Sequence, residues 1–420
     1  MSVTTAKRAI SLFSGAGGDT LGLERAGYQV VAYNEFNAAA IKTHQVMFPS
    51  ETMKLLANPD TGATNITKVP DSVFVQYRGN VNLVFAGFPC QGFSHAGKKR
   101  ANDSRNELVY EFARVVNLVQ PEWILGENVK GLLSRVGFPR GAQEQKHEQQ
   151  PVIQIICELF ESIGYKMTYS VVDASLLGIP QNRKRLLLVG HRGDLYPHIP
   201  WPQPQPVVCP RSFFEPHLIG AIELPQIPYA PETRDPLFWI HTTATEPTGT
   251  PHPNLVRLVQ GIRNMSGKEK EKQKQNANAS VGGGGGGTVV EPGGLVSFGV
   301  RKGGYHGMVL HPDKPCNTII STYNLCPRLF VGLHNPATPG RYWVRCMTPK
   351  ELGQIQGFPA DYPWQGSEKE QIIQIGNAVP PKMVEVVVGL LPFAEFKEMS
   401  QGSISESEFD SDSGSGSGSL

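Results

Sequence analysis

Residues 9–27, AISLFSGAGGDTLGLERAG, predict a β-strand, a glycine turn and a helix in direct succession. Gly15, Gly17 and Gly18 permit a tight turn and a close approach of the backbone to a ligand, because glycine has no side chain and tolerates positive φ. A strand, a turn and a helix in this order open a βαβ unit. This stretch therefore predicts an α/β fold built around a parallel sheet.

The alternation of apolar runs and helical segments continues to about residue 190. The predicted strands are AISLF, QVVAYN, NLVFAGF, EWILGEN and RLLLVG. The predicted helices, with apolar residues on one face, are DTLGLERAGY, NELVYEFARVVNLVQ and, after residue 340, TPKELGQIQGF and PPKMVEVVVGLL. Short strands that alternate with helices predict a βαβ-type sheet.

Composition divides the chain into four parts. Residues 1–195 carry the α/β pattern, and residues 341–399 return to it. Residues 196–340 begin with the proline-rich WPQPQPVVCPRSFFEPH, which disfavours helices and central strands, and predict a smaller, irregular second domain. Within this part, residues near 268–294 are of low complexity and predict a mobile insert. The tail, residues 400–420, holds too few apolar residues to fold.

Length and charge exclude several classes of protein. The 420 residues carry a formal net charge of only +2, so a nucleic-acid partner must be met by local basic patches. No apolar run reaches the ~18 residues that a membrane helix needs, and the N-terminal sequence has no apolar signal core. We therefore expect an intracellular monomer that is neither secreted nor bound to a membrane. The six cysteines form no CxxC pair, which argues against a structural metal or a disulfide framework.

Glu35 suggests an adenosine-containing cofactor at the glycine turn. It ends the second predicted strand, 17 positions after Gly18, near the ~20-residue offset at which a carboxylate binds both ribose hydroxyls. A glycine turn can also serve only to let a strand meet a helix. Because the spacing matches neither GxGxxG nor the ATP-binding P-loop, adenosylmethionine is favoured over nicotinamide cofactors and ATP.

A second motif, GFPCQGFS at residues 87–94, holds Cys90 behind a proline at the end of a predicted strand. At this edge of an open α/β sheet, a thiol can act as a nucleophile. Glu127 ends the following strand and could donate a proton, and Arg183 and Arg185 lie two apart on a later strand and could grip a carbonyl or a phosphate. Each residue alone also has a structural explanation, as a buried thiol, a helix cap or a solvated strand edge.

Seven motifs follow one another along the chain: FSGAGG, NEF, GFPCQGFS, ENVKG, QNRKR, KELGQIQGFP and QIGNAVPP. In this order, over roughly residues 8–195 and 341–392, the chain resembles the DNA (cytosine-5) methyltransferase family. The resemblance implies a Rossmann-like, adenosylmethionine-dependent methyltransferase sheet with a second, smaller and irregular target-recognition domain. It also implies double-stranded DNA as the partner, S-adenosyl-L-methionine as the cofactor, S-adenosyl-L-homocysteine as the product, no metal, and a place in restriction and modification.

The resemblance assigns catalytic roles to four residues. Cys90 would add to C6 of the target cytosine, and Glu127 would contact N3 and the exocyclic amine and favour protonation at N3. Arg183 and Arg185 would hold the base carbonyl and order the site. Addition of the thiolate makes C5 able to accept a methyl group, which splits one difficult step into two easier ones. The base must leave the duplex first, because C5 and C6 cannot be reached inside it.

Binding residues are also carried over from the family's motifs. Asn65 and Ile66 stand where family members often have an acidic residue for the adenine amine, and an asparagine carbonyl can accept the same hydrogen bond. The basic segment after Cys90 suits a loop that closes over DNA, and CNTIIST resembles the end of the recognition domain. The implied cofactor-binding residues are Phe13, Gly15, Gly17, Gly18, Glu35, Phe36, Asn65, Ile66, Gly87, Pro89, Asn377 and Val379, and the implied DNA-binding residues are Lys98, Lys99, Arg105 and Thr318.

Two alternatives remain open. The first is an RNA (tRNA) cytosine-5 methyltransferase on the same frame, although the variable region lacks that branch's Cys-Phe-Thr signature. The second is a catalytically silent DNA-binding relative, for which loss of the Pro-Cys, ENV or QxRxR motif is expected, whereas all three are intact. A dehydrogenase would leave Cys90 and the arginine pair unexplained. No motif encodes the recognised DNA sequence, an endonuclease partner or the base that removes the C5 proton.

Overall fold

The computed structural model describes residues 6–49, 51, 53–89, 108–136, 150–193, 199–224, 239–257, 259–260, 290–291, 295–298 and 307–392. Contacts within the chain divide it into two units, Met1–Leu390 and Leu391–Leu420. All of the predicted site residues belong to the first unit.

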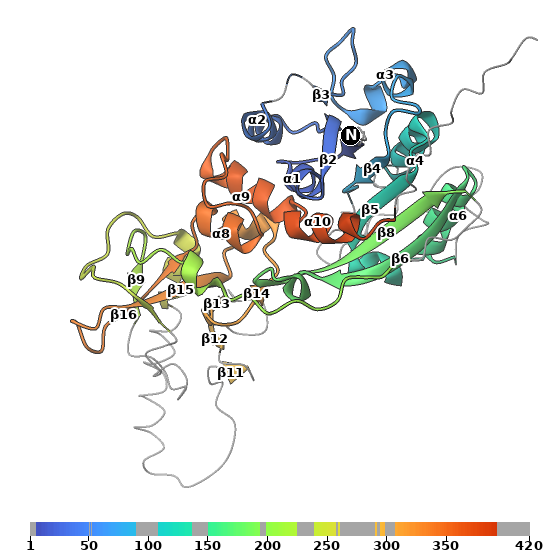
Figure 1. Ribbon diagram of the computed structural model, residues 1–420. Coiled ribbons are helices and arrows are strands. Elements are labelled where there is room, and N and C mark those ends of the chain that lie inside the picture. Colours follow the sequence, from blue (N-terminus) through green and yellow to red (C-terminus); the bar gives the residue numbers. More distant parts are fainter. Residues whose placement is uncertain are drawn as a thin grey trace, which may run out of the picture. The chain divides into compact units, whose positions relative to one another are not determined.

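A seven-stranded sheet organises the first unit (Figure 1). Its order is β3-β2-β1-β4-β5-β8-β6, in which the first five strands are parallel and β8 is antiparallel to both neighbours. All five predicted strands are present, and the Rossmann-like α/β class is confirmed. In spatial order the strands are β3 (Lys54–Leu55), β2 (Tyr28–Asn34), β1 (Lys7–Leu12), β4 (Leu83–Ala86), β5 (Trp123–Val129), β8 (Lys184–Arg192) and β6 (Tyr165–Asp173).

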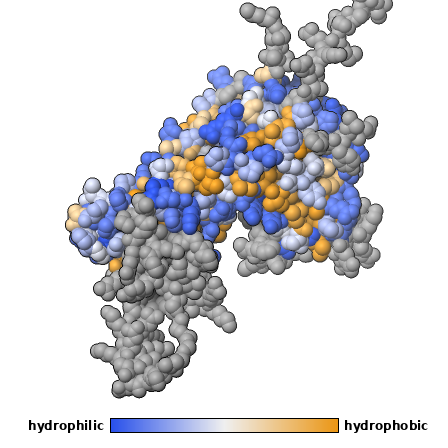
Figure 2. Space-filling model, turned by 60° about the horizontal axis from the view of Figure 1, so that its bottom comes forward, coloured by the Kyte–Doolittle hydropathy of each residue, from blue (hydrophilic) through white to orange (hydrophobic). Residues whose placement is uncertain are grey.

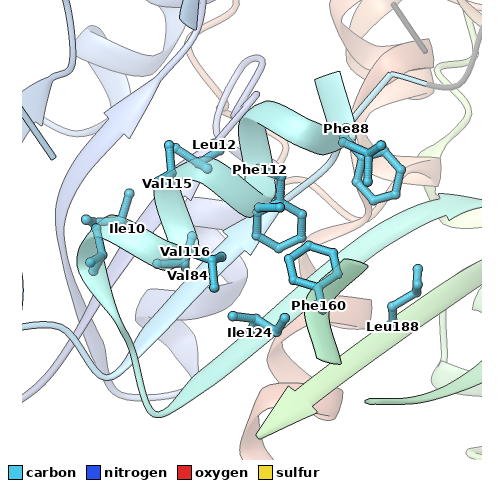
Figure 3. Close-up of a cluster of buried hydrophobic side chains, with 14 of the residues drawn as sticks. Ile10, Leu12, Val84, Phe88, Phe112, Val115, Val116, Ile124, Phe160 and Leu188 are labelled. Atoms are coloured by element: carbon cyan, nitrogen blue, oxygen red, sulfur yellow. The ribbon is translucent and has the colours of Figure 1, made fainter. Parts of the chain in front are cut away.

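Helices cover both faces of this sheet. Side chains alternate along a strand, so Ile10 and Leu12 of β1 enter an apolar cluster with α4 and α6, whereas Ser11 contacts α1 on the other face. In this cluster Phe112 of α4 and Phe160 of α6 meet edge to face, with ring centroids 4.9 Å apart (Figure 3). The helices are α1 (Gly18–Arg25), α2 (Ala38–Met47), α3 (Asp71–Val75), α4 (Leu108–Val119), α6 (Val152–Glu161), α8 (Pro349–Ile355), α9 (Glu368–Asn377) and α10 (Pro381–Gly389).

The strand order creates a switch point between β1 and β4. From β1 the chain proceeds to β2 and β3 on one side, and then returns to place β4 on the other side of β1. Open α/β sheets bind ligands beyond the carboxyl ends of their strands at such a point. The glycine turn follows β1 and the Pro-Cys motif follows β4, so both border the place where a ligand is expected.

A second sheet lies within residues 222–346. Its order is β11-β12-β13-β15-β16-β9, with β10 parallel to β15. The proline-rich residues 201–217 hold no strand, as predicted. The rest of this region is less irregular than its composition suggests. Its strands were not visible in the sequence, because strands of two to six residues are too short to show a clear alternation. The strands are β9 (Ile222–Glu223), β10 (Ile240–His241), β11 (Val290–Glu291, inside the low-complexity insert), β12 (Leu295–Phe298), β13 (Gly307–Val309), β15 (Leu329–His334) and β16 (Tyr342–Cys346).

A short parallel ladder connects this region to the central sheet. β7 (Gln181–Asn182), just before β8, pairs with β14 (Cys316–Asn317), with Cys316 opposite Gln181. The Cys316 amide also donates to the Pro180 carbonyl at 3.0 Å. The CNTIIST segment is thereby held against the start of the strand that carries Arg185.

Candidate active site at the carboxyl ends of the central strands

The turn between β1 and α1 has an unusual backbone. Phe13, Gly15 and Gly17 have φ values of +56°, +55° and +91°. Positive φ is uncommon for a residue with a side chain, so Phe13 marks a constrained turn. The Ser14 amide donates to the Asn34 carbonyl at 3.0 Å and fixes the turn against the end of β2. The predicted tight glycine turn is therefore confirmed.

The three glycines of this turn differ in their surroundings. A Cβ on Gly17 would lie 2.5 Å from Cε2 of Phe48, and a Cβ on Gly18 would lie 2.3 Å from the Val379 carbonyl oxygen. Gly15, by contrast, has no atom of the described residues within 4 Å of its Cβ position, apart from its own and those of its two chain neighbours. Gly17 and Gly18 thus serve close packing, whereas Gly15 borders open space in which a ligand could approach the backbone.

Glu35 holds the glycine turn from the end of β2. Its Oε2 accepts from the Gly15 amide at 2.8 Å, and its Oε1 accepts from the Phe36 and Asn37 amides at 2.8 and 2.7 Å. A carboxylate has about four acceptor positions, so about one remains for a further donor. The Phe36 ring is 70% exposed, so an apolar face is open to a ligand. Hydrophobic areas also lie among hydrophilic ones on the face of the molecule that Figure 2 shows.

The other predicted cofactor contacts divide into two groups. Gly87 lies beside Val379, because its Cβ position is 3.4 Å from Cγ2 of that valine; with Gly18, these residues come together at the switch point. Asn65 is exposed, but its side-chain carbonyl already accepts from the Thr67 amide at 3.2 Å. The Ile66 side chain is buried in the apolar core, so only its backbone could contact a ligand.

Pro89 and Asn377 complete the predicted set. Pro89 is half-buried and follows β4, and Asn377 is exposed at the last position of α9.

A buried polar cluster lies under the glycine turn. Asp19 accepts from the hydroxyls of Ser11 and Ser14, and the Thr20 hydroxyl contacts Ser14 at 3.1 Å and Nε2 of His44 at 2.9 Å. Burial raises the pKa of Asp19 to about 6, against the opposing effect of its hydrogen bonds. Burial also lowers the pKa of His44 to about 3, so His44 is neutral at physiological pH.

Asp19→Asn is expected to stabilise the protein at neutral pH but not in acid. The unfolded carboxyl loses its proton near pH 3.8 and the folded one near pH 6, so the free energy of unfolding of the wild type falls as pH rises through this interval. The wild type thereby loses about 3 kcal/mol of unfolding free energy between acid and neutral pH. The asparagine side chain is neutral throughout, so the variant does not lose it. Denaturant unfolding of both proteins across this range measures it. His44 titrates in the same way in both proteins, so its contribution cancels when their unfolding free energies are compared. If the unfolding free energies of the two proteins changed in parallel with pH, the expectation would be contradicted.

Glu127 and Arg185 form an ion pair at the end of β5. Arg185 lies opposite Val129 in the antiparallel β5 and β8 pair, which puts its side chain on the same face as that of Glu127. Arg185 Nε and Glu127 Oε1 are 2.8 Å apart, and the two side chains are only 12% and 11% exposed. A nearly desolvated carboxylate and guanidinium in this geometry can bind the polar edge of a flat ligand.

The ENV and Pro-Cys motifs lie on neighbouring strands. β4 and β5 are parallel with Ala86 opposite Gly126, so Gly87 and Glu127 come next in register. Asn128 Nδ2 also donates to the Phe88 carbonyl at 3.3 Å. The prediction that Glu127 and the chain leading to Cys90 share one sheet edge is therefore confirmed for the strands and for residues 87–89. Cys90 itself lies outside the described residues, as do Lys98, Lys99 and Arg105.

Arg183 is placed differently from the sequence expectation. Spacing predicts that both arginines leave one face of the same strand, but β8 begins at Lys184 and Arg183 belongs to the connection from β7. Its guanidinium is buried and donates to the carbonyls of Ile319 and Ala378, both at 3.0 Å. Arg183 and Arg185 therefore have separate surroundings. Arg183 binds backbone carbonyls of distant segments, whereas Arg185 pairs with Glu127 and donates to the neighbouring Lys184 carbonyl.

The remaining predicted DNA contact, Thr318, is half-buried directly after β14. Its hydroxyl donates to the Asn182 carbonyl at 2.7 Å. This bond adds a side-chain link to the ladder between β7 and β14. Ile320 and Leu325, which follow in the chain, are exposed apolar residues.

The five described cysteines are free thiols. Burial raises the pKa of Cys157 to about 11 and the pKa of Cys316 and Cys346 to about 12, so these three are protonated and poor nucleophiles at neutral pH. Among the described residues, no group of His, Cys, Asp and Glu is placed to hold a metal ion. The helices of the described ranges are also too short or too polar to cross a membrane.

Comparison with known proteins gives consistent matches over most of the chain. The model of a family described as C-5 cytosine-specific DNA methylase matches residues 7–391. The chain is 28% identical over 382 residues to Type II methyltransferase M.PspPI of Psychrobacter sp. (strain TA137), covering 88% of this chain and 75% of that protein. It is 35% identical over 197 residues to Type II methyltransferase M.XorII of Xanthomonas oryzae pv. oryzae, covering 46% of this chain and 42% of that protein.

Solved structures share the fold. The crystal structure of S. pombe Dnmt2 methyltransferase matches with a TM-score of 0.54 and 15% identity, over 92% of this chain and 98% of that chain. A putative DNA modification methyltransferase from a prophage of E. coli matches with a TM-score of 0.52 and 23% identity, over 91% of this chain and 98% of that chain. At these identities the likeness establishes the fold alone.

Proposed function

Because the chain belongs to the C-5 cytosine-specific DNA methylase family, and is thus a DNA (cytosine-5) methyltransferase, we propose that it acts through a covalent bond between Cys90 and C6 of the cytosine. The observation that carries this proposal is the Glu127 and Arg185 ion pair, which lies in register with the residues that lead into Cys90. M.PspPI, which matches over 88% of this chain, is named a Type II methyltransferase, so we also propose that the chain modifies a specific DNA sequence.

The proposed chemistry begins at Cys90. Its thiolate forms a bond to C6, and the electron pair displaced from the C5–C6 double bond makes C5 nucleophilic. Glu127 faces N3 and the exocyclic amine and stabilises the protonated ring as charge develops. Arg185 fixes the Glu127 carboxylate, and its fork of N–H donors suits the base carbonyl. Once C5 carries the methyl group, a base removes the C5 proton, its electron pair restores the C5–C6 double bond, and the thiolate leaves C6. Glu127 takes back the N3 proton, so the neutral base is regenerated.

Adenosylmethionine is the proposed cofactor, and when bound it supplies a sulfonium methyl group to C5. The residues around the glycine turn fit such a molecule. Gly15 borders open space, the Glu35 carboxylate keeps about one acceptor position for a ribose hydroxyl, and the exposed Phe36 ring offers a face for adenine. Gly87 and Val379 would border the cofactor from the other side of the switch point.

Further cofactor contacts are proposed with differing chemistry. Asn65 has its carbonyl engaged by Thr67, so we assign it a contact through its amide group, and Ile66 can contribute only its backbone. Phe13, Gly17 and Gly18 shape the glycine turn between β1 and α1. We propose that Pro89 and Asn377 contact the cofactor at the border of its site.

Recognition of DNA is assigned to the region between the two parts of the catalytic domain. The sequence pattern places the return to the catalytic domain at residue 341, but β16 (Tyr342–Cys346) pairs with β15 and β9 of the second sheet. We therefore propose residues 1–195 and 347–399 as the catalytic domain, residues 196–346 as the target-recognition domain, and residues 400–420 as a tail without a role in catalysis. Lys98, Lys99 and Arg105 are proposed to contact DNA phosphates, which position the duplex without reading its sequence. Thr318 is proposed to contact DNA from the end of the target-recognition domain. A flipped cytosine would then enter the site beside Glu127.

A trapping experiment tests this function. The purified full-length chain is incubated with tritiated adenosylmethionine and duplex DNA that carries 5-fluorocytosine, and the products are separated under denaturing conditions. Fluorine cannot leave as the C5 proton does, so we expect a labelled protein–DNA adduct. An adduct with fluorinated tRNA instead of DNA would move the substrate to RNA. The absence of both adducts would contradict the covalent mechanism.

A further inference from the structure

Two fully buried glutamines, Gln181 and Gln356, form a chain of hydrogen bonds between distant segments. The Ile319 amide donates to Gln181 Oε1 at 3.0 Å, Gln181 Nε2 donates to Gln356 Oε1 at 2.6 Å, and Gln356 Nε2 donates to the Ala378 carbonyl at 2.7 Å. A backbone amide can only donate and a carbonyl can only accept, so the backbone dictates the orientation of both side-chain amides. In these orientations the two glutamines meet donor to acceptor.

Arg183 closes this chain into a ring. Its Nη1 donates to the Ile319 carbonyl and its Nη2 donates to the Ala378 carbonyl, each at 3.0 Å. Ile319 and Ala378 are therefore connected by two independent routes, one through the glutamines and one through the arginine. We call the three side chains of Gln181, Arg183 and Gln356, with these two backbone partners, the polar ring.

The backbone segments on either side of the polar ring are in direct contact. A Cβ on Gly376 would lie 2.2 Å from the Ser321 amide nitrogen and 2.3 Å from the Ile320 carbonyl carbon. The end of α9 thus packs backbone to backbone against the residues that follow Ile319. With contact this close, neither segment can slide along the other without separation of the two backbones.

The polar ring lies between residues with three proposed functions. Thr318, a proposed DNA contact, immediately precedes Ile319. Val379, a proposed cofactor contact that packs on Gly18, immediately follows Ala378. Arg185 of the proposed catalytic pair is two residues from Arg183.

We propose that Gln181, Arg183 and Gln356 are positioning residues that hold residues 318–320 in register with Glu127 and Arg185 and thereby set how strictly the enzyme accepts its DNA site. The inference rests on the proposed DNA cytosine-5 methyl transfer. A buried polar network with its partners in place is rigid, and a displacement of about 1 Å at a reacting group lowers a rate by about 100-fold. The polar ring supplies such rigidity at the point where residues 318–320 meet the strand that carries Arg185.

Gln356→Met removes the two hydrogen bonds that Gln356 makes in the polar ring, with little change of volume, and Gln374→Met is the matched control. Gln374 is also buried, and its side chain accepts from the Thr43 hydroxyl at 2.7 Å and donates to the Gln365 carbonyl at 2.9 Å. Its backbone carbonyl accepts from the Ala378 amide at 3.0 Å, but this bond does not involve the substituted side chain. Both variants lose two buried hydrogen bonds, so a similar fall in Tm is expected. If Gln356→Met does not fold, Gln181→Met removes the acceptor of the Ile319 amide instead.

Two measurements separate positioning from stability. For Gln356→Met, kcat/KM on the recognised duplex and the preference over single-mismatch duplexes are each expected to fall about tenfold, with binding of adenosylhomocysteine within about threefold. Amide hydrogen exchange of residues 316–322 is expected to accelerate in this variant and not in Gln374→Met, whether or not the chain is active. Equal preference and equal exchange in the two variants would overturn the inference, whereas a wild type that methylates no DNA would overturn the proposed function instead.

Discussion

Cys90→Ala is expected to transfer methyl groups at least about 10⁴-fold more slowly than the wild type and to form no adduct with 5-fluorocytosine DNA. Without a thiolate no bond to C6 forms, so C5 of the cytosine stays a poor nucleophile. Alanine is smaller than cysteine and introduces no clash, so affinities for DNA and adenosylhomocysteine are expected to stay within about threefold. Single-turnover transfer of tritiated methyl groups and the two Kd values measure these effects.

The other cysteines provide the controls for this prediction. Cys209 and Cys326 are free and half-buried, so Cys209→Ala and Cys326→Ala change an accessible thiol elsewhere in the chain and are expected to keep wild-type activity. Because burial keeps Cys157, Cys316 and Cys346 protonated, none of these three is expected to replace Cys90. An adduct formed by Cys90→Ala would show that the nucleophile had been assigned to the wrong residue.

Strands buried on both faces were the most predictable part of the fold. β1, β2, β4 and β5 are buried over most of their length and each contains a short apolar run, as expected of parallel strands covered by helices on both sides. β6 escaped prediction because it lies at the sheet edge and mixes buried with exposed positions along its sequence YKMTYSVVD. Its antiparallel partner β8 was found as a strand, but the direction of pairing is not encoded in the strand itself.

One missed helix did carry a local signal. α9 begins with a capping box, in which Ser367 and Glu370 exchange hydrogen bonds between side chain and backbone. The spacing S-x-x-E ahead of IIQI predicts a helix start, so α9 could have been found from sequence. The second sheet offered no comparable signal, since its short strands depend on partners from distant parts of the chain.

The candidate site was predictable where its residues follow strands and unpredictable where they bind distant backbone. Glu35 and the glycine turn were found because both come directly after neighbouring parallel strands. Arg183 was placed beside Arg185 by its i+2 spacing, yet its partners are the carbonyls of Ile319 and Ala378, more than a hundred residues away. Gln356 was missed for the same reason, because no local pattern distinguishes a glutamine that joins two backbones.

Gly18→Ala is expected to weaken binding of adenosylhomocysteine by more than about 100-fold and to lower the free energy of unfolding by about 3 kcal/mol. The new methyl group would lie 2.3 Å from the Val379 carbonyl oxygen and 2.9 Å from Cζ of Phe358. The carbonyl cannot retreat easily, because the preceding Ala378 is held by Gln356 and Arg183. The start of α1 must therefore move, and the glycine turn moves with it.

The matched control for this last prediction is Gly389→Ala. Gly389 lies in α10 without a positive φ, and among the described residues outside its own stretch of helix no atom lies within 4 Å of its Cβ position. Alanine there is expected to leave binding unchanged and to stabilise the helix by up to about 1 kcal/mol. Calorimetric titration with adenosylhomocysteine and denaturant unfolding compare the two variants. Loss of stability with full binding in Gly18→Ala would mean that the turn serves packing alone. Loss of both would mean that one backbone contact, Gly18 against Val379, joins the cofactor site to the segment on which the polar ring is built.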